Sequence, residues 1–155
     1  MTETTRWLTE TEQHAWRSFI RLQEKLVGRL AREVQAESGL SAADYGVLVH
    51  LTEVPEGRLP VLELAKAVEW EKSRMSHHIN RMAKRGLVVR EDCPTDGRVA
   101  FVAVTPTGRE AIAAAAPCHV EAVRRLFINP LSPAELAMLA QICNLLLEEL
   151  DKDCA

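Results

Sequence analysis

The chain has 155 residues and a formal net charge of −3, which suits one domain with a core of its own. Its 47% hydrophobic and 26% charged residues are typical of a soluble globular protein. Its longest apolar runs are too short to cross a bilayer, and its polar, acidic first residues are unlike a signal peptide. We therefore expect a cytoplasmic protein that does not associate with a membrane.

Residues 9–38 predict one long amphipathic helix. Thr9 and Glu12 have the spacing of a capping box, in which the hydroxyl and the carboxylate each bind the other residue's backbone amide. From Trp16 to Val34, apolar residues recur at helical spacing. This stripe is too apolar to face water, so the helix needs a partner.

Three shorter helices are expected next. Ser41 begins the second helix, which ends before Pro55. Residues 61–68 predict a short helix, and residues 72–86 predict another after a tight connection. Gly86 fits the left-handed position that follows a helix, because a residue without Cβ adopts this conformation at little cost.

The pattern then changes to β-structure. Residues 87–91 and 99–104 are β-rich, and the Asp-Gly pair between them is typical of a hairpin. Thr105 caps a further helix, in which Pro117 should cause a kink or a break. Ser132 begins a capping box for the last helix.

The expected fold class is mainly α-helical with a small β-hairpin wing. A helix-turn-helix followed by a hairpin is the winged-helix arrangement, and we assign it to residues 41–104. The helices at 9–38 and 105–152 flank it, and residues 1–155 form a single unit.

Positive charge is concentrated at the fourth predicted helix and after it. Residues 72–109 carry eight basic and three acidic groups, whereas both flanks are net acidic. Such a patch is typical of a surface that binds a polyanion, although a solvated helix face has the same composition. On a helical wheel Met75, Ile79 and Met82 share one side, so the polar and basic groups share the other.

This helix suits the major groove of DNA, which accepts one α-helix and exposes base edges. Arg pairs with guanine, Asn pairs with adenine, and Ser and Lys more often hold phosphates. The two histidines have either role, or are simply exposed, and as neighbours they diverge too far to share a metal ion. Asp96 can steady Arg98 in the minor groove, or the two form a plain surface ion pair. The predicted DNA contacts are Lys72, Ser73, Arg74, Ser76, His77, His78, Asn80, Arg81, Lys84, Arg85, Asp96 and Arg98.

Two segments carry a specific combination of motifs. They are LPVLELAKAVEWEKSRMSHHINRMAKRGLVVRE at 59–91 and DGRVAFVAVTPTG at 96–108. The second contains Asp96, then Arg98, then a Val-Thr-x-x-Gly step into a helix. With the helical flanks, these segments resemble the MarR family (multiple antibiotic resistance regulators) over nearly the whole chain, and residues 117–136 are similar to an actinobacterial branch.

The resemblance implies an obligate homodimer that regulates transcription, usually as a repressor. Two recognition helices about one helical turn apart would then contact a pseudo-palindromic site in double-stranded DNA. The resemblance also places the first, fifth and sixth helices in the dimer interface, which agrees with the need of their apolar stripes for a partner. Many relatives release DNA when a small aromatic acid or another effector binds between the dimer and DNA-binding regions.

The departures from the family pattern indicate which effector to expect. The first helix lacks the reactive cysteine of peroxide-sensing relatives, and the chain shows no His, Cys and Glu cluster like that of zinc-sensing relatives. We therefore expect no metal and no cofactor, and either a small aromatic or phenolic effector or none. The candidate pocket residues, for which ordinary packing is the alternative, are Trp16, Arg17, Tyr45, His50 and Trp70.

Other classes of function fit the sequence less well. An enzyme is not expected, because the chain has no Gly-rich phosphate loop, nucleophile motif or carboxylate pair. A winged-helix module that binds protein would present a more aromatic and less cationic face. The four cysteines show no metal-binding spacing, so free thiols are expected. Cys143 is expected in the core, and a redox sensor built on Cys93 or Cys118 stays as an alternative.

Overall fold

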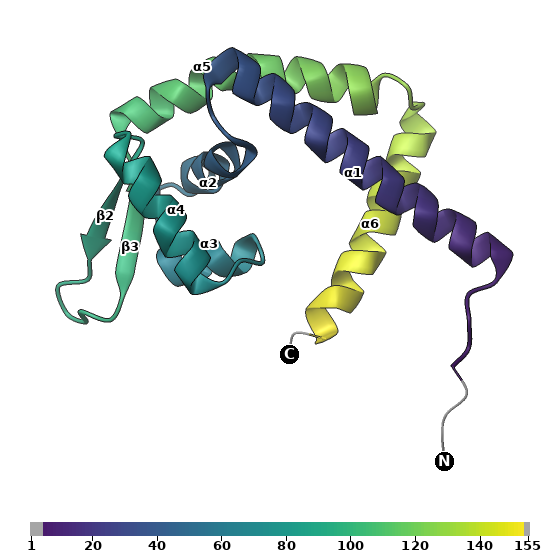
Figure 1. The fold of residues 1–155 in the computed structure, drawn as a ribbon, viewed down its shortest axis with the longest axis horizontal. Helices are drawn as coiled ribbons and strands as arrows, with labels where there is room; N and C mark the ends of the chain where they lie inside the picture. Colours follow the sequence, from purple (N-terminus) through teal and green to yellow (C-terminus); the bar gives the residue numbers. More distant parts are fainter. Residues whose placement is uncertain (1–4, 154–155) are drawn as a thin grey trace. The chain divides into compact units, whose positions relative to one another are not determined.

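The computed structural model describes residues 5–153 (Figure 1). The chain divides into two compact units, Met1–His119 and Val120–Ala155. The elements are α1 (Glu10–Ser38), α2 (Ala42–Glu53), β1 (Arg58–Pro60), α3 (Val61–Ala67), α4 (Lys72–Lys84), β2 (Val88–Asp92), β3 (Ala100–Val104), α5 (Pro106–Val123), the π-helix η1 (Arg124–Ile128) and α6 (Pro133–Asp153).

Local capping sets the ends of the first two helices. The Glu12 amide donates to the Thr9 hydroxyl and the Thr9 amide donates to the Glu12 carboxylate, which confirms the predicted capping box of α1. Gly39, at φ 71°, follows this helix in the left-handed conformation. Ser41 and Asp44 form a second capping box at the start of α2.

The fifth helix differs from the prediction at Pro117. α5 passes through this residue without a break, and η1 follows it directly. The loss of one backbone hydrogen bond at a proline is local, and the alanines before it have the highest helix propensity, so the helix continues. Of the two predicted outcomes at Pro117, a kink or a break, the break is therefore wrong. The capping box at Ser132 before α6 is confirmed.

The wing is a three-stranded antiparallel sheet of order β1-β3-β2. β2 and β3 form the predicted hairpin, with Val88 opposite Val104. The strand β1 pairs with the other edge of β3, with Leu59 opposite Val102. The sequence pattern does not predict β1, because three residues are too few to show alternation.

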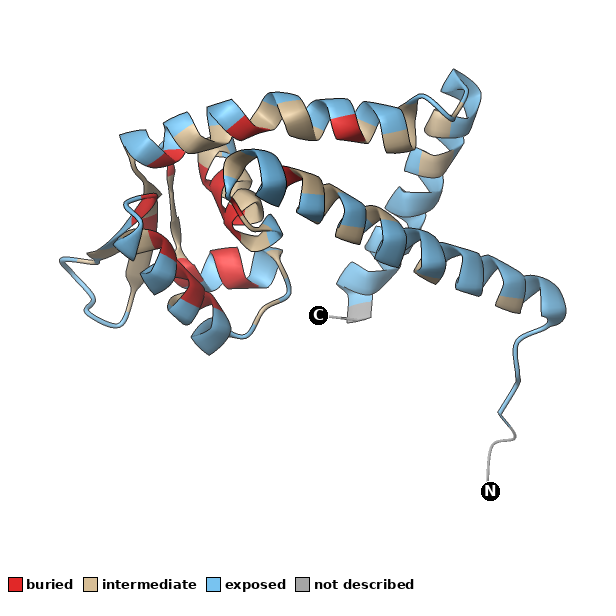
Figure 2. Ribbon diagram, turned by 45° about the horizontal axis from the view of Figure 1, so that its top comes forward, coloured by how far each residue is buried: buried red, intermediate tan, exposed pale blue. Residues whose placement is uncertain are grey.

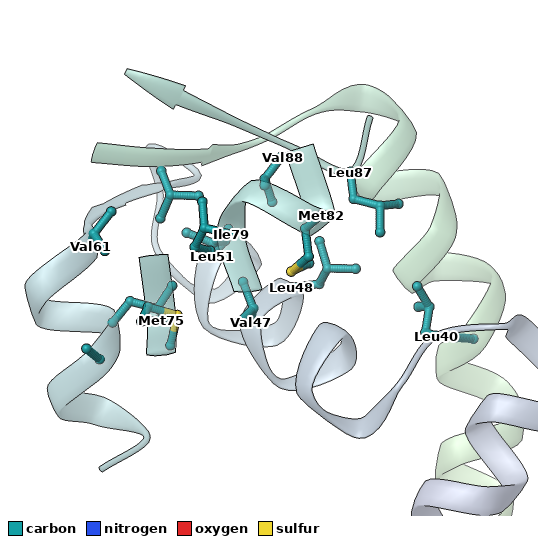
Figure 3. Close-up of a cluster of buried hydrophobic side chains, with 14 of the residues drawn as sticks. Leu40, Val47, Leu48, Leu51, Val61, Met75, Ile79, Met82, Leu87 and Val88 are labelled. Atoms are coloured by element: carbon teal, nitrogen blue, oxygen red, sulfur yellow. The ribbon is translucent and has the colours of Figure 1, made fainter. Parts of the chain in front are cut away.

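The hydrophobic core lies between α2, α3, α4 and the sheet. Leu48 and Leu51 of α2 and Met75, Ile79 and Met82 of α4 are fully buried in it, and Figure 3 shows these side chains packed together. The spacing of the three α4 residues places one side of that helix against the core. The opposite side of α4 therefore faces solvent.

Most of α6 is exposed (Figure 2), and its exposed residues include large apolar ones. Cys143 on the same helix is exposed too, so its predicted place in the core of this chain is wrong. The sequence pattern shows only that the stripe is apolar, not whether its own chain covers it. In the described part of the chain no single helix has the length and apolar composition to cross a membrane. The bent pair Pro106–Ile128 and Pro133–Lys152 has that length and composition only when the two helices are taken together. The exposed apolar residues of α6 are Met138, Ile142, Leu145, Leu146, Leu147 and Leu150.

Candidate nucleic-acid interface

α4 presents polar and basic residues on the side opposite the core. Met75, Ile79 and Met82 are each 0% exposed, and Ser76 lies half-buried at the border. The predicted outward position is confirmed for Lys72, Ser73, Arg74, His77, Asn80, Arg81, Lys84 and Arg85, all of which are exposed.

His78 is the exception on this helix. It is only 6% exposed, so the prediction that it faces outward beside Arg74 and Arg81 is wrong. The reason lies in its spacing, since positions 75, 78, 79 and 82 follow the i, i+3, i+4, i+7 pattern of one helix face. A side chain on that buried face does not reach base edges, and His78 leaves the set of candidate DNA contacts.

Asp44 of α2 is the main polar partner behind α4. It is 3% exposed, and its Oδ1 lies 3.1 Å from His78 Nε2, although the N–H direction does not satisfy hydrogen-bond geometry. Its Oδ2 accepts hydrogen bonds from Arg85 Nη1 at 2.6 Å and from the Ser41 amide at 3.0 Å. Burial alone would raise the pKa of this carboxyl, but the hydrogen bonds and the charge of Arg85 lower the pKa below its ordinary 3.8. Asp44 is therefore ionised at neutral pH.

Arg85 joins the end of α4 to the start of α2. Besides the bond to Asp44, its Nη2 lies 3.4 Å from the Gly39 carbonyl, while 46% of its side chain stays exposed. Sequence reasoning missed the ion pair, because the two residues are 41 positions apart and Asp44 already has a local role as a capping residue. Arg85 thus has a structural role that the predicted DNA contact did not include.

Two exposed arginines of α4 are held by neighbouring rings. The Arg74 guanidinium lies 3.8 Å from the centroid of the Trp70 ring, a cation–π contact. Arg81 Nη2 lies 3.1 Å from His78 Nδ1, and the His78 ring meets Trp70 edge-on at 5.5 Å. These contacts restrict both guanidinium groups in the DNA-free chain, which lowers the entropy cost of binding a ligand.

The wing carries the predicted pair of Asp96 and Arg98. The Arg98 amide donates to the Asp96 carboxylate at 3.0 Å, and Arg98 Nε lies 3.5 Å from the same oxygen. The Arg98 side chain is nevertheless 94% exposed. The turn therefore holds the backbone of Arg98 and leaves its guanidinium in solvent.

The five predicted effector-pocket residues do not line one cavity. Tyr45 lines a cavity of about 200 Å³ between α1 and α2, with His119 of α5, whose ring centroid lies 4.7 Å from that of Tyr45. Trp70 lines a separate groove along α2 and α4. Between residues 5 and 153, no group of three or more His, Cys, Asp or Glu side chains is placed to hold a metal ion. The predicted residues that line neither space are Trp16, Arg17 and His50.

The chain is similar in sequence and fold to known transcriptional regulators. Residues 38–99 match the sequence profile of the MarR family. AbsC, a MarR family transcriptional regulator from Streptomyces coelicolor, is 40% identical to the chain; the match covers 96% of this chain and 99% of AbsC with a TM-score of 0.89. The chain belongs to the MarR family.

Two other relatives support the same assignment. Sco3205, a MarR family transcriptional regulator from Streptomyces coelicolor whose crystal structure is a complex with DNA, is 40% identical, covers 96% of this chain and 93% of its own, and has a TM-score of 0.90. The transcriptional regulator HosA of Escherichia coli O111:H- is 29% identical over 126 residues, which are 81% of this chain and 91% of HosA. As a MarR family member, the chain is a DNA-binding transcription regulator.

Proposed function

We propose that the chain acts as a homodimer in which α4 of each protomer enters the major groove at one half of a pseudo-palindromic DNA site. The observation that carries this proposal is the division of α4 into a fully buried apolar side, Met75, Ile79 and Met82, and an exposed cationic side. Two such helices roughly 34 Å apart match half-sites one turn of DNA apart. In the same arrangement, Arg98 of the wing enters the minor groove.

The exposed residues of α4 divide by chemistry. Arg74 and Arg81 are the candidates for base contacts, because a guanidinium pairs bidentately with guanine and both groups are already restricted. Asn80 is the candidate for adenine. The remaining candidates on α4 contact phosphates, and they are Lys72, Ser73, Ser76, His77, Lys84 and Arg85. Asp96 contributes only by steadying Arg98 in the minor groove.

Exposed apolar surface supports the homodimer. Trp16 and Phe19 of α1 are 56% and 50% exposed, and Leu145 and Leu146 of α6 are 60% and 56% exposed. Soluble monomers rarely leave several large apolar side chains of one helix together in water, and a second copy of the chain would cover those of α1 and those of α6. The helices at 9–38 and 105–152 are then the dimerisation helices, and residues 41–104 form the DNA-binding region.

The cavity beside Tyr45 supports a repressor whose repression is relieved when a small aromatic or phenolic effector binds. Apolar residues of α1, among them Leu30 and Val34, line it together with Tyr45 and His119. Burial raises the pKa of the Tyr45 phenol, so Tyr45 keeps a hydroxyl that donates to a carboxylate or phenolate. Tyr45 follows Asp44, which binds Arg85 of the α4 end, and a ligand in the cavity therefore acts close to that pair.

A redox sensor is the second candidate that a specific observation favours. Cys93 at the wing turn is hydrogen-bonded to the Thr95 side chain, and this bond and the backbone amides of the turn lower the pKa of its thiol. If peroxide treatment abolishes DNA binding by the wild-type protein but not by Cys93→Ser, the result would support this candidate over an organic effector.

The test of DNA recognition starts from duplexes enriched by the wild-type protein from a random-sequence pool. Arg74→Ala and Arg81→Ala should each weaken binding to the enriched duplex by about 1–3 kcal/mol and relax its sequence preference. Lys25→Ala is the charge-matched control, because Lys25 is exposed on α1, and its affinity should equal that of wild type. Equal affinities for all four proteins would contradict the assignment of these arginines.

A further inference from the structure

His78 links a buried carboxylate to an exposed arginine of α4. Its Nε2 lies 3.1 Å from Asp44 Oδ1, and its Nδ1 lies 3.1 Å from Arg81 Nη2. Its ring is fixed on a third side by the edge-on contact with Trp70. The imidazole thus occupies a defined place between α2 and the solvent-facing side of α4.

The protonation state of the ring follows from its partners. An arginine side chain has only donors, so His78 Nδ1 accepts the hydrogen bond from Arg81. The neutral ring therefore carries its proton on Nε2, which faces the Asp44 carboxylate. A second proton on Nδ1 would place two donors against each other and end the contact with Arg81.

The charges around the ring oppose that second proton. Burial is the largest cause that lowers the pKa of His78 below its ordinary 6.5; the Asp44 carboxylate raises the pKa, and the charges of Arg81, Arg85 and Arg74 lower it further. Asp44 belongs to α2 and the three arginines lie on α4 or directly follow it. The ring is therefore neutral at neutral pH, and its protonation requires a pH below 6.5.

We propose that His78 is a positioning residue that, oriented by Asp44, holds the Arg81 guanidinium in place for DNA and releases it when Nδ1 takes up a proton from solvent. The proposal rests on the proposed function, in which Arg81 contacts the DNA. It adds that specific affinity falls as the pH falls, although protonation adds positive charge next to a polyanion. Non-specific attraction to phosphates would change in the opposite direction.

The test measures the dissociation constants of two duplexes between about pH 7.5 and about pH 5.5: one enriched by wild-type protein from a random pool and one scrambled. All variants carry His77→Gln, because His77 is exposed on the same helix and its removal leaves His78 as the one histidine of α4. In this background the enriched duplex should lose affinity toward low pH relative to the scrambled one. Adding His78→Gln, which keeps a donor toward Asp44 without the titrating acceptor, should remove that loss.

A double-mutant cycle at about pH 7.5 tests the link to Arg81. His78→Gln should weaken binding to the enriched duplex by roughly three- to tenfold, the size of one hydrogen bond. In an Arg81→Ala background the same substitution should change nothing. Additive losses, or an unchanged pH profile in His78→Gln, would overturn the proposal.

Two further outcomes separate this proposal from the proposed function. If wild-type protein enriches no duplex from the pool, the proposed function itself is contradicted. If Arg81→Ala binds the enriched duplex as tightly as wild type, Arg81 has no role in recognition and the positioning role of His78 is contradicted with it. If His78→Gln does not fold, ¹⁵N shifts of the imidazole in wild-type protein decide: an unprotonated Nδ1 at neutral pH is expected, and a protonated Nδ1 overturns the proposal.

Discussion

The helix-turn-helix core and α6 are both rich in leucine, but their leucines are buried to opposite degrees. Leu48 and Leu51 in the core are each 0% exposed, whereas Leu145 and Leu150 of α6 are 60% and 61% exposed. Figure 2 shows α6 as mostly exposed along its length. The core is therefore completed by one chain, and the face of α6 is not. An apolar stripe in a sequence indicates that a surface needs cover, but not which molecule provides it.

The largest expected effect is in the core. Leu48→Ala should lower the free energy of unfolding by about 2–5 kcal/mol, because it opens a cavity in a fully packed site. The control is Val89→Ala, since Val89 of β2 is 45% exposed and its truncation should cost under about 0.5 kcal/mol. Urea unfolding gives both values, and similar losses would mean that the core is not where the structure places it.

The buried ion pair should give the next largest effect. Asp44→Asn should cost roughly 1.5–3 kcal/mol of unfolding free energy at neutral pH, the size of a hydrogen bond to a charged group. Glu12→Gln is the matched control, because Glu12 has the same capping-box position in exposed surroundings at α1. A loss for Asp44→Asn no larger than that for Glu12→Gln would argue against the ion pair.

The pH dependence of that loss follows from the direction of the pKa. The pKa of Asp44 is lowered below 3.8 in the folded chain, so its stabilising contribution is present above 3.8 and is lost as the pH falls below it. The pKa of His78 is lowered below 6.5, so the unfolded chain binds that proton more readily and stability declines as the pH falls below 6.5. Unfolding measured along a pH series should show both declines in wild type, and only the second in Asp44→Asn.

A substitution on α6 should affect assembly rather than the core. Leu146 is 56% exposed in the single chain, so Leu146→Ser should weaken dimerisation by about 1–2 kcal/mol through the apolar area that is no longer buried. Glu148→Gln on the same helix is the control, because Glu148 is exposed and polar. Sedimentation at several concentrations measures the shift, and a profile identical to wild type would remove Leu146 from the interface.

The smallest expected effect concerns the wing. Arg98→Ala should make the dependence of log Kd on log salt shallower by about one phosphate contact, because its guanidinium is 94% exposed and faces solvent. Stability should stay within about 0.5 kcal/mol of wild type. An unchanged salt slope would show that the wing makes no ionic contact with DNA.

Much of the fold follows from local chemistry in the sequence. The capping boxes at Thr9 and Ser132 and the hairpin all rest on neighbouring residues, and each is confirmed. The features that the sequence did not predict correctly depend on residues that are distant in the chain or on a less obvious helical spacing. Nothing local pairs Asp44 with Arg85, and only close inspection of the 75, 78, 79 and 82 spacing places His78 on the buried face.

The outward side of α4 could be predicted because its inner side is so regularly apolar. The lining of the cavity beside Tyr45 could not be predicted, because a cavity is formed by side chains from several helices. Tyr45 lies beside His119, although 74 positions separate them along the chain. The identity of the aromatic residues alone does not indicate which of them lie close together in the folded chain.

The most direct test of the central claim, that the exposed face of α4 recognises DNA sequence, is the ratio of dissociation constants for the enriched and the scrambled duplex at physiological salt. The account predicts that wild-type protein binds the enriched duplex about 10³-fold or more tightly than the scrambled one, and that Arg81→Ala lowers this ratio. Equal dissociation constants for the two duplexes with wild-type protein would contradict it.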